Sequence, residues 1–131
     1  MRILLVDDES FLRRLIIKAL NIMGHSQIIE ASSVDEAADI IQEREIHFVI
    51  TDWEMPGKNG GELIRLIRQD SANRHIPVLI ISGSLQIYEM EHLSQFGITD
   101  RHLLSKPFKL SELGNRIESI LVQNNIPPIR S

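Results

Sequence analysis

Four apolar runs in this chain are each followed directly by polar side chains that could take part in chemistry. These side chains are Asp7 and Asp8 after residues 3–6, Asp52 after 48–51, Ser82 after 77–81 and Lys106 after 103–105. In open parallel sheets the carboxyl ends of the strands meet at one edge, and ligands bind beyond that edge. If the apolar runs are such strands, three carboxylates, one hydroxyl and one ammonium group meet at a single edge of a sheet.

Carboxylates that lie this close repel one another, so at least one stays protonated unless a cation neutralises them. Mg2+ suits the set, because it takes oxygen ligands and is usually held by one or two carboxylates, water and phosphate oxygens. Zinc is the poorer candidate, because the chain has no Cys and no paired-His spacing. A carboxylate beside a metal can attack phosphorus, while Lys106 and Ser82 could contact phosphoryl oxygens. The set therefore suggests an aspartyl phosphate.

Each of these residues also has an ordinary structural interpretation. Asp7 and Asp8 could cap the helix that follows them, where Asp is favoured and offsets the helix dipole. Ser82 could bond to nearby backbone, and Lys106 with the proline after it could form only a rigid turn. Taken one at a time, these alternatives stay open. The coincidence of all the residues at strand ends favours the metal interpretation.

The elements that must position these residues alternate along the chain. Compact apolar runs predict strands, and apolar residues at i, i+3 and i+4 predict amphipathic helices. The predicted strands are 3–6, 27–31, 48–51, 77–81 and 103–105, and the predicted helices are 11–23, 33–44, 62–69, 86–95 and 111–122. Strands that are apolar throughout are typical of a parallel sheet covered on both faces. The pattern predicts a doubly wound α/β fold.

Local signals support several of these boundaries. Gly24 stands where a glycine often ends a helix. Ser33 and Glu36 have the spacing of a capping box, in which each side chain bonds to the other residue's backbone N–H. Residues 56–60 are dense in turn-forming types and predict a loop before the third helix.

Composition limits the class of protein. The chain has 131 residues, which is one domain of ordinary size, and 18 Asp and Glu against 14 Lys and Arg give a formal net charge of −4. This balance argues against general electrostatic binding to nucleic acid or to a membrane surface. No apolar run approaches the roughly 20 residues that span a bilayer, and acidic residues interrupt the first run before a signal peptide could form. We expect a cytoplasmic domain with no direct nucleic-acid or membrane partner.

Five short motifs follow one another in an order typical of one family. They are Leu5-Val6-Asp7-Asp8-Glu9, Asp52-Trp53-Glu54-Met55-Pro56-Gly57, Gly60, Ser82-Gly83 and Lys106-Pro107-Phe108. Over essentially its whole length the sequence resembles the receiver domain of bacterial two-component response regulators, in the form of a stand-alone, chemotaxis-regulator-like domain. The resemblance implies a flavodoxin-like five-stranded parallel sheet of order 2-1-3-4-5 with five helices. It also implies a receiver domain at 1–122 and a tail or linker start at 123–131.

The resemblance also implies residue roles. Asp52 would accept a phosphoryl group from the phosphohistidine of a sensor histidine kinase or histidine phosphotransfer protein. Mg2+ would be held by the carboxylates of Asp8 and Asp52 and the backbone carbonyl of Glu54, with Asp7 acting largely through bound water. Ser82 and Lys106 would contact the phosphoryl group. Catalysis would extend only to the domain's own phosphorylation and dephosphorylation.

The implied output is a change of surface. In such domains the fourth helix, fifth strand and fifth helix change shape and are read by a downstream protein or an output domain, which the sequence does not identify. A homodimer through the same surface is one option for the assembly. Glu54 and Ser84 are expected to face solvent beside the phosphoryl group. Glu54 is expected to change the rate of dephosphorylation, in a direction that the sequence does not determine.

The sequence departs from the family pattern at three places. Gly83 stands where Ala is usual, which should loosen the loop. Leu103 stands where a switching Tyr or Phe is common, and the stretch 97–106 is longer than usual. The five histidines show no ligand spacing and are expected at the surface or partly buried.

Two other functions fit the same architecture less well. A Mg2+-dependent aspartyl-phosphate phosphatase or phosphotransferase usually carries its two acids two residues apart after the first strand, whereas Asp7 and Asp8 are adjacent. A flavin or nucleotide binder would need a glycine-rich loop for phosphate, and the chain has neither a GxGxxG turn nor a Walker-type loop.

Overall fold

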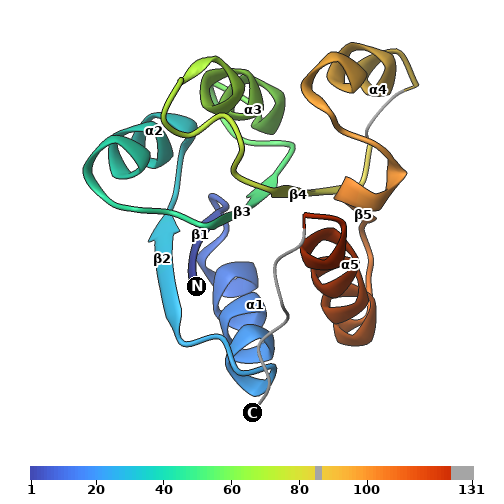
Figure 1. Ribbon diagram of the computed structural model, residues 1–131. Coiled ribbons are helices and arrows are strands. Elements are labelled where there is room, and N and C mark those ends of the chain that lie inside the picture. Colours follow the sequence, from blue (N-terminus) through green and yellow to red (C-terminus); the bar gives the residue numbers. More distant parts are fainter. Residues whose placement is uncertain (85–86, 125–131) are drawn as a thin grey trace.

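Five parallel strands form one sheet in the order β2-β1-β3-β4-β5 (Figure 1). The strands are β1 (Arg2–Val6), β2 (Gln27–Ala31), β3 (Phe48–Asp52), β4 (Val78–Ser82) and β5 (Leu103–Ser105). The structure, a computed structural model, describes residues 1–84 and 87–124. The predicted strands, their parallel pairing and the strand order implied by the resemblance are confirmed.

Helices cover both faces of the sheet. They are α1 (Ser10–Ile22), α2 (Val34–Glu43), α3 (Gly60–Gln69), α4 (Ile87–Leu93) and α5 (Leu110–Gln123), with short 3-10 turns η1 (Ser94–Phe96) and η2 (Asp100–His102). Figure 1 shows α1 and α5 on one side and α2, α3 and α4 on the other. The predicted fourth helix, 86–95, starts outside the described residues and is divided into α4 and η1. Of the predicted tail at 123–131, residues 125–131 lie outside the described residues.

Alternate residues of each strand build two separate hydrophobic layers. Leu4 and Val49 pack in the layer beneath α2 and α3, whereas Leu5 and Ile50 pack in the layer beneath α1 and α5. All four side chains are at most 1% exposed. Because both faces are covered, the central strands β1, β3 and β4 are apolar over most of their length, and their polar residues lie at the strand ends. The edge strand β2 differs, because it carries Gln27 and the exposed Glu30. The pattern of the central strands concentrates the chemistry at one edge of the sheet.

The local boundary signals hold with one change. Gly24 has φ 97°, the left-handed conformation expected after a helix. The Ser33 hydroxyl accepts from the Glu36 N–H at 3.1 Å, as predicted. The Glu36 carboxylate, however, accepts from the N–H of Ser32 at 2.9 Å, so the reciprocal bond predicted to Ser33 is wrong by one residue.

The stretch between α4 and β5 departs from a simple loop. It contains η2, in which the His102 Nδ1 accepts from the Thr99 N–H at 3.0 Å. Leu103 opens β5, is half-buried and packs against the layer beneath α2 and α3. An aliphatic side chain therefore occupies this place beside the sheet. Two of the five histidines, His25 and His102, are buried at 3% and 6% exposure, which corrects the expectation that all five lie at the surface or are only partly buried.

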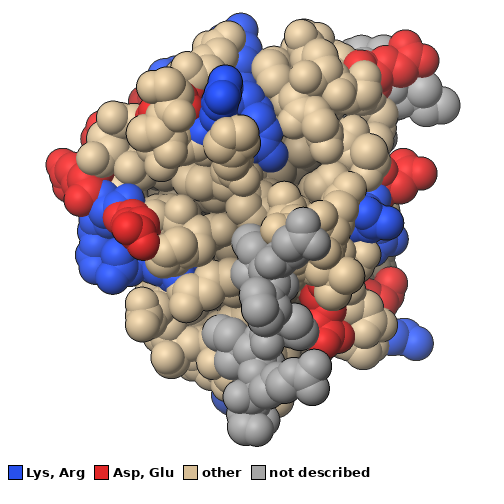
Figure 2. All heavy atoms as spheres, viewed as in Figure 1, with Lys and Arg blue, Asp and Glu red and all other residues tan. Residues whose placement is uncertain are grey.

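Charge is spread over the surface. On the face drawn in Figure 2, Lys and Arg form separate groups with uncharged or acidic side chains between them, so its described part has no continuous basic surface. Among the described residues, no helix has the length and apolar character needed to cross a membrane.

Gly60 brings the start of α3 against the end of β3. Its N–H donates to the carbonyl of Trp53 at 3.0 Å, and a Cβ at this position would lie 2.6 Å from the carbonyl oxygen of Asp52. No real Cβ contact is that short, so a side chain here must displace the backbone that carries Asp52. Glycine is required at this position by close approach.

We predict that Gly60→Ala destabilises the fold by about 1–3 kcal/mol, because the added methyl overpacks a backbone contact. The matched control is Gly83→Ala, whose Cβ would meet only Lys106 Cβ at 3.7 Å. That change should be neutral or stabilising, since it removes freedom from the unfolded chain. Urea unfolding of both variants measures the free energies, and an equal effect of the two substitutions would contradict the close-approach argument.

Candidate functional site

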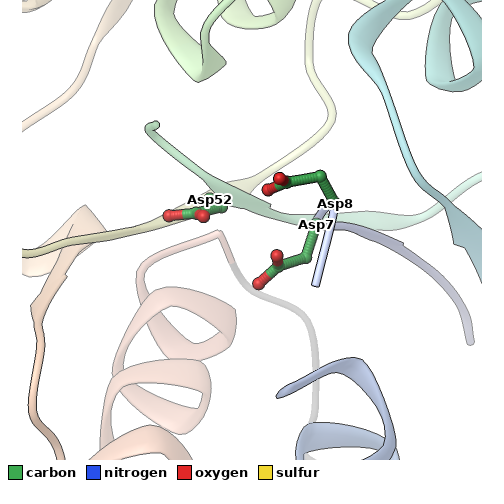
Figure 3. A group of neighbouring side chains, drawn as sticks. All are labelled: Asp7, Asp8 and Asp52. Carbon is green, nitrogen blue, oxygen red and sulfur yellow. The ribbon is translucent and has the colours of Figure 1, made fainter. Parts of the chain in front are cut away.

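Strand register places the acidic residues side by side. Val6 of β1 pairs with Thr51 of β3, so the residues that follow, Asp7 and Asp52, are neighbours at the same edge of the sheet. One side-chain oxygen from each of Asp7, Asp8 and Asp52 lies within 4.8 Å of the others. In Figure 3 the three carboxylates project toward the same side, from the ends of β1 and β3. We call these three residues the acidic cluster.

Burial makes this cluster costly as three free charges. Asp7 is 2% exposed and Asp52 is 3% exposed, whereas Asp8 is exposed. Burial raises the pKa of Asp7, and the Glu9 N–H and the Lys106 ammonium offset only part of that rise. Burial also raises the pKa of Asp52 to about 6, against the lowering effect of Lys106 and with added repulsion from Asp7 and Glu54. The cluster is therefore short of positive charge.

Lys106 supplies the positive charge nearest to Asp52. The pairing of Ser82 with Ser105 brings the end of β5 to the same edge, and Lys106 Nζ lies 3.1 Å from Asp52 Oδ1. Burial alone would lower the pKa of Lys106, but Asp52, Asp7 and Glu54 outweigh it and raise the pKa, so the ammonium stays charged. The Lys106–Pro107 peptide is cis.

The surroundings of Asp52 Oδ1 show whether a cation fits the acidic cluster. This buried oxygen has no hydrogen-bond partner among the described residues, so its contact with Lys106 is an ion pair outside hydrogen-bond geometry. The Asp52 carboxylate, which carries this unsatisfied buried oxygen, lies beside two further carboxylates, and together they form a set of hard oxygen donors. The residues present therefore fit Mg2+ better than a softer metal.

The Ser82 hydroxyl is engaged by Glu54 and by the backbone of Ser84. The Ser82 hydroxyl donates to Glu54 Oε1 at 2.8 Å and accepts from the Ser84 N–H at 3.1 Å. The Ser84 hydroxyl also donates to Glu54 Oε1. Burial acts to raise the pKa of Glu54, but the hydroxyls of Ser84 and Ser82 outweigh it and lower the pKa. Glu54 and Ser84 are exposed, as expected, and the carboxylate is nevertheless engaged.

The structure thus brings together Asp7, Asp8, Asp52 and Lys106. Ser82 follows at the end of β4, where its hydroxyl donates to Glu54. The sequence did not indicate the Glu54 bonds, because they depend on side-chain torsions. It also missed Arg13 of α1, which donates to the backbone carbonyl of Asp7. Arg13 is one of two adjacent arginines on an amphipathic helix, and nothing in their types or spacing distinguishes them.

Fold and site together define a class. The family model described as the response regulator receiver domain matches residues 3–118. The chain belongs to the response regulator receiver domain family. It is 33% identical over 125 residues to the chemotaxis protein CheY of Pseudomonas aeruginosa, which covers 95% of this chain and 99% of that protein. It is 31% identical over 126 residues to the chemotaxis protein CheY1 of Helicobacter pylori strain 26695, covering 95% and 100%.

Solved structures agree. A putative response regulator from Chloroflexus aurantiacus is 27% identical and superposes with a TM-score of 0.81, covering 92% of this chain and 97% of that chain. The chemotaxis protein CheY4 of Vibrio cholerae is 24% identical, with a TM-score of 0.82 and coverage of 92% and 98%, and supports the fold. The chain is a receiver domain of the CheY-like class, with the flavodoxin-like fold that the resemblance implied.

We predict that Asp52→Asn stabilises the metal-free chain near neutral pH. Because the pKa of Asp52 rises from 3.8 to about 6 on folding, the folded chain gains stability from this proton below the ordinary value. That gain is lost as pH rises through about 6, and amounts to about 3 kcal/mol at most. Urea unfolding with a chelator across this range measures the difference between Asp52→Asn and wild type.

The two proteins should be equally stable near pH 4 and diverge through pH 6, within the window that the shift defines. Asp39→Asn, at an exposed position on α2, is the control and should follow wild type throughout. A variant no more stable than wild type at neutral pH would show that burial of the Asp52 charge carries no net cost.

Proposed function

We propose that this chain is a phosphorylation-activated signalling switch, in which Asp52 accepts a phosphoryl group from the phosphohistidine of a sensor kinase or phosphotransfer protein. The observation that carries the proposal is the buried Asp52 carboxylate with Lys106 Nζ at 3.1 Å and two further carboxylates beside it. This arrangement joins a nucleophile, a cation and metal-ligating oxygens at one edge of the sheet.

In the proposed reaction a carboxylate oxygen of Asp52 attacks phosphorus as the phosphorus–nitrogen bond of the donor breaks. Lys106 offsets charge on an equatorial phosphoryl oxygen, and it is already paired to the nucleophile in the unphosphorylated state. Asp8, Asp52 and the backbone carbonyl of Glu54 would hold Mg2+, with Asp7 acting through water, and the bound ion would supply charge stabilisation. Self-dephosphorylation by water completes the cycle, and no other substrate is turned over.

The product changes the charge at the strand ends by adding a phosphoryl group of up to about two negative charges. That group competes with Glu54 for the Ser82 hydroxyl, because both are anionic acceptors beside the same donor. When Ser82 changes partner, the backbone after β4 moves with it, and α4 follows directly in the chain. The surface of α4, β5 and α5 is then read by a downstream protein or an output domain, through a shift between two conformers.

The upstream partner has to cover the edge of the sheet where Asp52 lies. Beside Lys106, a groove lined mainly by apolar side chains runs between α1 and the start of α5, and includes Leu12, Leu15 and Phe108. Leu15 and Leu110 both line this groove and are 43% and 53% exposed, so they contribute to one exposed apolar surface. A phosphodonor protein could bury this surface while presenting its histidine to Asp52.

The switch is proposed to comprise residues 1–122, with 123–131 as a tail or linker start, and to act in the cytoplasm without direct contact to nucleic acid or membrane. A homodimer through the α4-β5-α5 surface is included in the proposal as one form of the active state.

The test is labelling of Asp52. We predict that the purified chain, given Mg2+ and a small acyl phosphate, gains one phosphoryl group, and that Asp52→Asn gains none. Trp53 adjoins Asp52 and is the only tryptophan, so its fluorescence should respond to Mg2+ and then to beryllofluoride. Intact-mass spectrometry measures the labelling. A wild-type chain that never becomes labelled, or steady turnover of a phosphate ester, would overturn the switch.

We further predict that Glu54→Ala speeds phosphorylation by a small acyl phosphate about fivefold. Removing Glu54 frees the Ser82 hydroxyl for the phosphoryl oxygen and removes a negative charge, which is worth about 1 kcal/mol. Stopped-flow Trp53 fluorescence measures the rate.

Ser84→Ala is the matched control, because it removes only the second hydroxyl on the same carboxylate and should change the rate less. In a Ser82→Ala background the effect of Glu54→Ala should shrink to its charge component. An undiminished effect there would show that Glu54 does not act through Ser82.

A further inference from the structure

One guanidinium group connects three elements around the acidic cluster. Arg13 Nη1 donates to the backbone carbonyl of Asp7 at 2.6 Å, and its Nε donates to Glu30 Oε1 at 2.9 Å. Arg13 lies on α1, and Glu30 lies in β2, where it pairs with Leu5 of β1. The Arg13 side chain is 17% exposed and the Glu30 side chain 47% exposed. Arg13 is therefore mostly buried beside the site, whereas Glu30 stays at the surface.

The bond to Asp7 acts on a particular peptide group. The carbonyl of Asp7 belongs to the planar peptide that joins Asp7 to Asp8, so fixing this oxygen fixes the direction in which the chain enters Asp8. The other polar groups of Asp7 are also held, since its N–H donates to the Ala31 carbonyl at 3.0 Å and its Oδ1 accepts from the Glu9 N–H at 2.8 Å. Arg13 completes this set on the carbonyl side.

We propose that Arg13, anchored by Glu30, is a positioning residue that orients the peptide between Asp7 and Asp8 so that both carboxylates converge with Asp52 on one cation. This inference rests on the proposed function, because it assigns Arg13 to the same Mg2+ site. Arginine suits the task, since its rigid fork holds two acceptors at a fixed angle, whereas a lysine ammonium has no such fork.

Geometry rather than charge carries the effect. The cation that lowers the pKa of Asp7 is Lys106, on the other side of the site. Arg13 donates one hydrogen bond to the backbone carbonyl of Asp7 and one to Glu30. Neither bond reaches a carboxylate of the acidic cluster. Groups that orient metal ligands in this way typically contribute about 10- to 100-fold to metal affinity.

The first measurement is Mg2+ affinity of the full chain, followed by Trp53 fluorescence. Arg13→Ala should weaken binding about 10- to 100-fold, and Glu30→Ala should weaken it less, in the same direction. The double variant should equal Arg13→Ala, because Glu30 acts only through Arg13. Arg14→Ala is the matched control, since Arg14 is the next residue of the same helix and is exposed. It should bind as wild type does.

Rescue separates positioning from general support of the fold. Arg13→Lys should recover less than half of the lost binding free energy, although it keeps the charge and most of the side-chain bulk. Glu30→Ala removes a half-exposed side chain, so it tests the inference even if Arg13→Ala unfolds the chain. Wild-type affinity in Arg13→Ala, or additive effects of the two alanine substitutions, would overturn the inference.

A second measurement needs no metal. Hydrogen exchange of the Glu9 amide, which donates to Asp7 Oδ1, should be faster in metal-free Arg13→Ala than in wild type and unchanged in Arg14→Ala. If the wild-type chain does not bind Mg2+, the proposed metal site is wrong. Hydrogen exchange of the Glu9 amide then tests by itself whether Arg13 positions the peptide after Asp7. Unchanged exchange in Arg13→Ala would overturn that role.

Discussion

The repulsion among buried carboxylates at the ends of β1 and β3 is the constraint around which the site is organised. Asp7 and Asp52 are almost completely buried within reach of one another, and burial raises the pKa of both. A carboxylate in this position is costly as a charge, and Lys106 offsets only part of the cost. The carboxylates stay together nonetheless, because the register of β1 and β3 places Asp7 and Asp52 side by side.

The sheet fixes the positions of Asp7 and Asp52. Asp52 is the last residue of β3, and its backbone pairs with Ile81 of β4. The N–H of Asp7 donates to the carbonyl of Ala31 and so extends the pairing of β1 with β2. Two hydrophobic layers hold the strands from both faces. A carboxylate on such a frame cannot move away from its neighbours, so a cation or a change of protonation has to relieve the repulsion.

The sequence predicted the parts of the molecule that depend on chain position alone. The strands and the convergence of Asp7, Asp52 and Lys106 follow from apolar runs and from the residues at their ends, whereas the strand order came from the family resemblance. The parts that it did not predict depend on torsions and on contacts between distant elements. The bonds of Glu54 to two hydroxyls and the bond of Arg13 to a carbonyl are of this kind. Short-range spacing carries no signal for either.

The bonds around the site differ in how readily they exchange partners, and this difference bears on how a switch could work. Asp7 and Asp52 are fixed through backbone pairing on central strands of the sheet, which a local change of charge does not break. The Ser82 hydroxyl is held by hydrogen bonds to Glu54 and to the Ser84 N–H, which can exchange partners while the backbone of Ser82 stays paired with Ser105. In the proposed switch, charge added at Asp52 would therefore be relieved where the bonds are exchangeable, at the end of β4, while the acidic side would keep its geometry.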